Sequence, residues 1–248
     1  MKKNALLALI LLQGPAWSAT PHLTKEQFNH FYQNHLKDKL IFQVGFLEAY
    51  QGKNQSVKIN DLIGDAFTVT DGSNMNALIG LGYYLDARSF GPVKFQYGLD
   101  AMYLMPTSVN GQVLQEQAFD NFSYSYKVTN VPIYAAIKAI TDTPRKNLQL
   151  YFDGGIGPNI ISISNFNQAP LNSFTIPEQL FNSSTKADFS AMIGVGLRTT
   201  EIAQRPLECG YRFMYLGQSE LAINNPKVAN NLSTGQSYAH SLVCGLTF

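Results

Sequence analysis

The sequence predicts an all-β fold, namely an eight-stranded antiparallel up-and-down transmembrane β-barrel preceded by a short N-terminal amphipathic helix. Three observations lead to this prediction. From residue 40 onward, eight stretches alternate apolar and polar residues with a period of two, which is typical of strands with one apolar face. The connections between these stretches are alternately long and short. No stretch after the N-terminus approaches the roughly 18 to 20 apolar residues that a membrane helix needs.

Residues 1–18 have the features of a secretory signal peptide. Lys2 and Lys3 precede an apolar run over residues 5–12, and small residues follow a Gly-Pro break. We expect cleavage after Ser18, because this puts small residues at both specificity positions. The apolar run is too short to remain as a membrane anchor. Loss of the two lysines lowers the formal charge from +1 to about −1, which indicates no nucleic-acid partner.

Residues 19–39 are predicted to form a separate N-terminal periplasmic helical segment. A capping box of Thr24 and Gln27 precedes residues at helical spacing, namely Phe28, Phe31, Tyr32, His35 and Leu36. A helix about 10 Å across does not fit inside an eight-stranded barrel, so we expect this one outside the lumen, at the periplasmic rim. His30 and His35 do not share a helix face, so they indicate no metal site.

The predicted barrel covers residues 40–248. Its strand-like stretches are residues 40–50, 75–86, 92–105, 124–140, 147–160, 187–199, 207–216 and 238–248. Each reaches or exceeds the roughly 9 to 11 residues that a tilted strand needs to cross a bilayer. Outer-membrane barrels have short periplasmic turns and long external loops, which matches the alternating connections. A soluble β-sandwich, the alternative that composition leaves open, has no reason to segregate its loops in this way.

The second long connection contains Asn110-Gly111, a dipeptide typical of tight hairpin turns. A turn at this dipeptide would let the two flanking strands continue as a hairpin beyond the membrane. The sequence therefore predicts four sizeable external loops, one of which is a hairpin.

Several short motifs recur in one known family. They are G-L-G-Y-Y at residues 80–84, N-V-P-I-Y at 130–134, L-Y-F-D-G-G-I-G-P at 150–158 and the ending G-L-T-F at 245–248. The chain from residue 40 onward thereby resembles the small outer-membrane β-barrel family that includes the OmpA membrane domain, OmpX and opacity-type surface proteins. The resemblance implies a place in the bacterial outer membrane, in contact with its lipid. A C-terminal phenylalanine is the assembly signal of such barrels, so the resemblance implies that Phe248 and its strand bind the barrel-assembly machinery.

Six charged residues lie on the strand faces that point into the predicted lumen: Lys94, Lys138, Asp153, Arg198, Glu208 and Arg212. Buried charges must be paired, so we expect a lumenal network in which Arg198 meets Glu208 and Asp153 reaches Arg212. Such a network either fills the barrel as a structural plug or acts as a gate whose pairs exchange. Eight strands leave little room, which favours the plug. Inward glycines, Gly194 among them, either make space for large neighbours or leave a narrow path.

The two cysteines, Cys209 and Cys244, are predicted near the periplasmic ends of neighbouring strands, facing lipid. A cross-strand disulfide is compatible with this placement and with an oxidising periplasm. A strand shift of one or two residues would prevent the bond. We therefore expect two unpaired thiols, with the disulfide as the alternative.

The sequence predicts no catalytic, cofactor or metal site. His240 is the only histidine on a predicted strand, and its neighbour Ser241 points to the opposite face, so the two do not form a nucleophile and base pair. The predicted function is a non-enzymatic outer-membrane barrel with a largely plugged lumen, which serves envelope integrity and surface interaction through its external loops. The expected partners of these loops are host or phage surface molecules. Alternatives are a narrow channel for small or hydrophobic solutes and a lipid-modifying enzyme.

Overall fold

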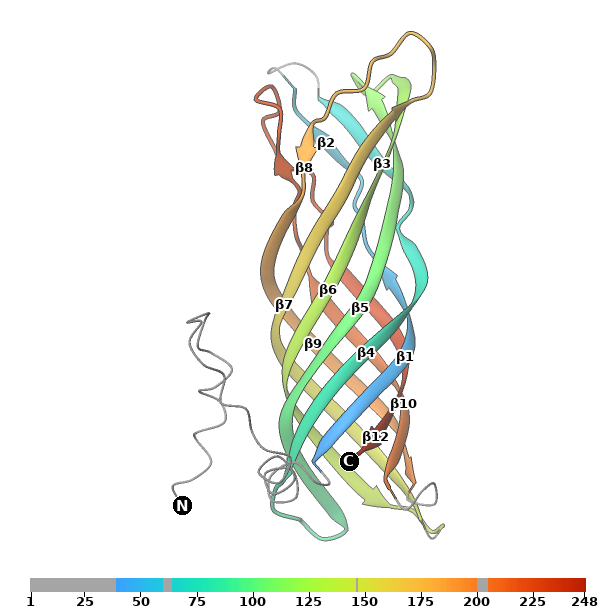
Figure 1. Ribbon diagram of the computed structural model, residues 1–248, viewed down its shortest axis with the longest axis vertical. Helices are drawn as coiled ribbons and strands as arrows, with labels where there is room; N and C mark the ends of the chain where they lie inside the picture. The colour runs from blue at the N-terminus through green and yellow to red at the C-terminus, as the bar shows by residue number, and fades with distance from the viewer. Residues whose placement is uncertain (1–38, 60–63, 146, 200–204) are drawn as a thin grey trace, which may run out of the picture. The chain divides into compact units, whose positions relative to one another are not determined.

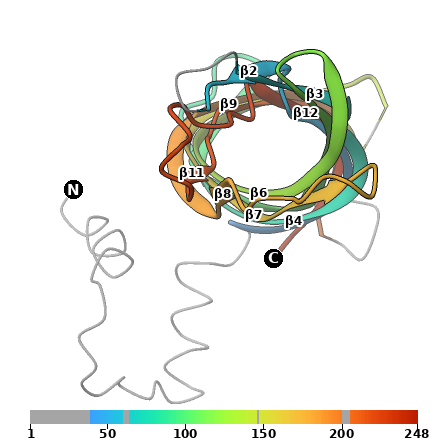
Figure 2. The same cartoon turned by 90° about the horizontal axis from the view of Figure 1, so that it is seen from above.

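The computed structural model describes residues 39–59, 64–145, 147–199 and 205–248. The predicted signal peptide and all but the last residue of the predicted helical segment lie outside these residues. Within them, no helix is long and apolar enough to cross a membrane. Eight antiparallel strands form a closed ring (Figures 1 and 2): β1 Leu40–Tyr50, β4 Ser73–Asp86, β5 Val93–Gln115, β6 Phe119–Asp142, β7 Leu148–Pro170, β9 Ser184–Thr199, β10 Leu207–Gly217 and β12 Ser237–Thr247.

Each of these strands pairs with the strand before and after it, and the ring closes between the first and the last. The closing seam runs in unbroken register from Ile41 opposite Thr247 to Tyr50 opposite Tyr238. The predicted eight-stranded antiparallel up-and-down barrel is therefore confirmed, and every predicted strand stretch coincides with a strand of the ring.

Four shorter strands lie at the end of the barrel that carries the long connections (Figure 1): β2 Gln55–Val57, β3 Asp65–Asp71, β8 Phe181–Asn182 and β11 Ala222–Ile223. The β2–β3 hairpin attaches to the outer half of β5, and β8 pairs with β11. Much of what the sequence predicts as external loop is therefore strand.

The strands β5, β6 and β7 are 23, 24 and 23 residues long, about twice the length needed to cross a bilayer. The predicted turn at Asn110-Gly111 is wrong, because both residues lie inside β5. Inward residues continue to alternate beyond the membrane at Val109 and Val113, which are fully buried, and this burial outweighs the preference of the dipeptide for a turn. The hairpin beyond the membrane is present, but its turn lies six residues later.

The turn itself is formed by Glu116 and Gln117, whose φ angles are 52° and 61°. The Ala118 amide donates a hydrogen bond to the Gln115 carbonyl oxygen at 3.0 Å, which closes the turn. Two successive central residues with positive φ define a type I′ turn, the geometry that matches the twist of a β-hairpin.

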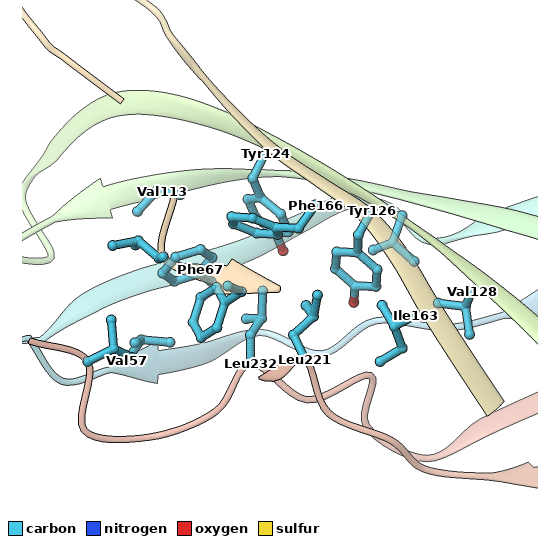
Figure 3. Packing of buried hydrophobic residues seen from close by; sticks show 14 of the residues in the cluster. Val57, Phe67, Val113, Tyr124, Tyr126, Val128, Ile163, Phe166, Leu221 and Leu232 are labelled. Carbon is cyan, nitrogen blue, oxygen red and sulfur yellow. The ribbon is translucent and has the colours of Figure 1, made fainter. Parts of the chain in front are cut away.

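The outward face of the membrane-crossing part of the ring is mainly apolar. Phe46, Ile137 and Leu242 are each more than 60% exposed on it. Inward apolar residues form two clusters. The inner apolar cluster lies in the barrel proper and includes Leu47 and Met102. The outer apolar cluster, shown in Figure 3, joins β2, β3 and the external halves of the long strands.

Candidate functional site

A first group of charges lies near the end of the barrel that holds the short turns; we call Lys138, Arg198 and Glu208 the lower ion layer. Lys138 of β6 forms a buried ion pair with Glu208 of β10. Its Nζ lies 4.5 Å from the ring centre of Tyr84 and 5.2 Å from that of Tyr151, within cation–π range. Arg198 Nη1 lies 3.4 Å from Glu208 Oε1. A single carboxylate thus compensates two cations.

The upper ion layer lies further toward the external end and consists of Arg212, Asp100, Asp153, Gln43 and Tyr84. Arg212 Nη2 lies 2.6 Å from Asp153 Oδ2, and its Nη1 lies 3.3 Å from Asp100 Oδ2. The same Nη1 donates to Gln43 Oε1 at 2.6 Å. Asp100 also accepts hydrogen bonds from Gln43 at 2.9 Å and from Tyr84 at 3.0 Å. Five strands contribute one side chain each, so the layer ties opposite walls of the barrel together.

Inward glycines make space for these large side chains. A Cβ atom added at Gly194 would lie 2.2 Å from Asp153 Oδ1 and 2.6 Å from Arg212 Cγ. One added at Gly196 would lie 2.6 Å from the ring of Tyr151. The sequence leaves two roles open for these glycines: they either make space for large neighbours or leave a narrow path through the lumen. The contacts favour the first role.

The inner apolar cluster continues on the external side of the upper ion layer. Met214 comes one inward position after Arg212 along β10 and faces Met192 of β9. Both methionines are buried, as are Leu47 and Met102. An apolar section of the lumen therefore follows directly on the ionised one.

The outer apolar cluster occupies the barrel beyond the membrane-crossing part (Figure 3). The ring of Phe67 lies 5.1 Å from that of Tyr124 and 6.0 Å from that of Phe181, both in edge-to-face geometry. The connection between β10 and β12 adds Leu221 and Leu232, which are buried in the same cluster. The external segments thus pack against the wall and one another, and apolar contact holds them.

Of the six charged residues that the sequence assigns to the lumen, five lie in the two layers. Lys94 is exposed, and among the described residues no ion pair includes it. Asp100 and Gln43, which the sequence did not predict as members of the network, contact Arg212 in the upper layer. The sequence contains an indication of the Asp100 role, because Asp100 follows Lys94 at an even spacing and so lies on the same face of the strand.

The expectation of unpaired thiols is wrong: Cys209 and Cys244 form a disulfide, with their Cα atoms 4.1 Å apart. The two residues lie directly opposite each other in the β10–β12 register, and no strand shift separates them. Both are on the exposed, outward face. The described residues contain no group of three or more histidine, cysteine, aspartate or glutamate side chains able to hold a metal ion.

His240 lies on the outward face of β12, toward the external end. Its Nδ1 contacts the Tyr211 hydroxyl of β10. This neighbour was not predicted from the sequence, because the contact depends on strand register. Ser241 points into the barrel, where its hydroxyl donates to the Arg212 carbonyl oxygen at 3.2 Å. His240 and Ser241 are therefore on opposite sides of the wall.

A closed eight-stranded ring with an apolar outer wall and an ion-paired lumen defines an outer-membrane β-barrel protein. Solved structures agree with this class. The chain is similar to outer membrane protein OprG from Pseudomonas aeruginosa, with a TM-score of 0.53 and 14% identity over 86% of this chain and 97% of that chain. At this identity the similarity shows the fold.

Two further structures are similar at lower TM-scores. Neisserial surface protein A matches with a TM-score of 0.36 and 14% identity over 84% of this chain and 97% of that chain. Ail of Yersinia pestis, in complex with the heparin analogue sucrose octasulfate, matches with a TM-score of 0.35 and 14% identity over 86% of this chain and 100% of that chain. No family model and no curated protein matches the chain.

Proposed function

We propose that this protein is a non-enzymatic outer-membrane barrel with a largely plugged lumen, which serves envelope integrity and surface interaction through its external loops. The observation that carries the proposal is the succession of two ion layers and two apolar clusters along the lumen. Arg212 at the centre of the upper layer is 3% exposed, and Phe67 and Phe181 in the outer cluster are fully buried. Buried side chains occur in successive sections of the lumen, which supports a plugged barrel.

Conductance in planar bilayers tests this proposal. We expect no discrete channels from the wild-type protein. Arg212→Ala removes the side chain that bridges Asp100 and Asp153, and it leaves two buried carboxylates that draw in water and cations. Channels in this variant alone identify the upper ion layer as the plug, and silence in both proteins indicates that the apolar clusters suffice.

Arg88→Ala is the matched control, because it removes the same side chain at an exposed position outside the lumen. Discrete channels in the wild type contradict the plugged barrel. They support the narrow channel instead, and one observation favours it: the buried Asp153 Oδ1 and Asn159 Oδ1 have no hydrogen-bond partner among the described residues. Water or a polar solute in the lumen would supply partners for both atoms.

The external end supports a role in surface interaction. Phe174 and Ile176, between β7 and β8, are 96% and 84% exposed. Large apolar side chains in contact with water are typical of surfaces that meet a partner. Host or phage surface molecules remain the proposed partners of these loops.

The lipid-modifying enzyme requires a nucleophile and a base on one outward face. Tyr211 and His240 meet this requirement in geometry alone, because a neutral phenolic hydroxyl is a weak nucleophile. We therefore interpret this pair as a binding element.

A further inference from the structure

The outward wall of the barrel carries an apolar hollow of about 690 Å³ where β1, β4, β10 and β12 lie side by side. Three small outward residues line it, namely Ala77 and the disulfide-bonded Cys209 and Cys244. The larger side chains of Phe46 and Leu242 complete the lining. Small residues in an otherwise bulky wall leave a depression that extends from the middle of the membrane-crossing strands toward their periplasmic ends.

Polar groups lie at the external side of this hollow. Tyr211 lines it, and the Tyr211 hydroxyl contacts His240 Nδ1. Glu48 of β1 lies directly opposite His240 in the register of the closing seam. Ionisable residues on a lipid-facing wall are costly, so their presence here indicates a function.

Aromatic rings surround these polar groups. The Tyr50 and Tyr238 rings stack at 5.1 Å, and the Phe213 ring lies 5.2 Å from that of His240. Aromatic residues of this kind mark the membrane–water interface in barrels. The polar groups therefore lie at the level of the lipid headgroups of the external leaflet, with the hollow beneath them at the level of the acyl chains.

We propose that this hollow binds one acyl chain of a lipopolysaccharide molecule, whose amino-sugar head contacts Glu48, Tyr211 and His240. The wall faces the bilayer, so its occupant is a lipid, and the polar groups lie at the external leaflet, which lipopolysaccharide forms. The hydroxyl and amide groups of the sugar head both donate and accept hydrogen bonds. They match a carboxylate acceptor beside an imidazole and a phenol, whereas a phosphate group alone would be repelled by Glu48.

Native mass spectrometry of the protein extracted from its membrane in mild detergent tests the proposal. We expect the wild type to retain one lipopolysaccharide molecule. Ala77→Phe fills the hollow from the outward face, and we expect retention to fall by about tenfold or more, the effect of losing roughly 1.4 kcal/mol of binding. His240→Phe keeps an aromatic ring but removes both ring nitrogens, and we expect the same loss.

Ala135→Phe is the matched control, because Ala135 is an exposed, outward residue of β6 that does not line the hollow. We expect this variant to retain lipid as the wild type does. Folding of each variant is verified by its gel migration before boiling, and His240→Phe alone decides the question if Ala77→Phe does not fold. Equal retention by all four proteins, or retention of a phospholipid in place of lipopolysaccharide, overturns the proposal.

Discussion

Asp65 is a buried carboxylate on the water-exposed side of the barrel. It begins β3, and its Oδ1 accepts a hydrogen bond from the Glu116 amide at 3.0 Å, which supports the turn between β5 and β6. Burial raises the pKa of Asp65 above its usual value, the amide hydrogen bond lowers it in part, and the Glu116 charge raises it further. The neutral form of Asp65 is therefore more favoured in the folded protein than in the unfolded chain.

We predict that Asp65→Asn stabilises the protein at neutral pH. Because the folded pKa lies above the unfolded value, the folded state binds the proton more tightly. The wild type therefore loses stability as the pH rises through the unfolded and then the folded pKa. The asparagine variant keeps an acceptor oxygen and has no such loss. Urea unfolding in lipid vesicles at pH 3 and pH 7 checks this: the advantage of the variant should be larger at pH 7, and an advantage confined to pH 3 would refute it.

The upper ion layer shows which features of the lumen can be predicted from the sequence and which cannot. The sequence places Arg212 and Asp153 on inward faces, because strand alternation fixes the side of the wall. Which inward residues meet across the lumen depends on strand stagger and tilt, which the alternation does not encode. Lys94 and Asp100 share a face of β5, yet only Asp100 is at the height of Arg212.

At the level of elements, the turn between β5 and β6 is built from unfavourable residues. Glu116 and Gln117 both have positive φ, which costs an L-residue roughly 1 to 2 kcal/mol relative to its preferred regions. Asparagine and glycine adopt these angles readily.

We therefore predict that the double substitution Glu116→Asn and Gln117→Gly raises the free energy of unfolding by about 1 kcal/mol or more. The Glu116 amide still donates to Asp65, so the supporting hydrogen bond remains. Urea unfolding measures the change, and Thr129→Gly within β6 serves as a control that should destabilise by roughly 0.5 to 1 kcal/mol. A double variant less stable than the wild type would show that the strain is absent.

The positions of the strands follow from the sequence, whereas the lengths of β5, β6 and β7 do not. Alternation of apolar and polar residues indicates a strand wherever one face is apolar, and this alternation is present in each membrane-crossing segment. Beyond the membrane the wall is stabilised by segments distant in the chain: Phe67 of β3 packs on Tyr124 of β6 and Phe181 of β8. These contacts form only once the ring exists, so the local pattern of each loop does not reveal them.

For the molecule as a whole, the Cys209–Cys244 disulfide links β10 and β12, the last two strands of the ring, and the two cysteines are 35 residues apart in the sequence. A cross-link that closes a loop of this length restricts the unfolded chain, and such bonds contribute typically about 2 to 4 kcal/mol. The bond joins β12 to β10, and the closing seam joins the other edge of β12 to β1. The edge of β12 beside β10 is therefore held by a covalent bond as well as hydrogen bonds, and the edge beside β1 is held by hydrogen bonds.

We predict that the folded protein resists sodium dodecyl sulfate at room temperature and migrates anomalously until it is boiled. The double variant Cys209→Ser and Cys244→Ser should convert to the unfolded band at a lower temperature than the wild type. A gel series across temperature, run without reductant, measures both midpoints. Identical midpoints would mean that the bond does not restrict the unfolded chain.

The closing seam has a consequence for how fast the barrel forms. It pairs Ile41 with Thr247 and Tyr50 with Tyr238, residues separated by almost the full length of the barrel sequence. The entropic cost of closing so long a loop is modest, because it grows only with the logarithm of length. The search for that pairing is slow, since rates fall as contacts become more distant in sequence. Until this seam closes, β1 and β12 are open edges that other chains can pair with, so crowding should favour aggregation most strongly just before closure.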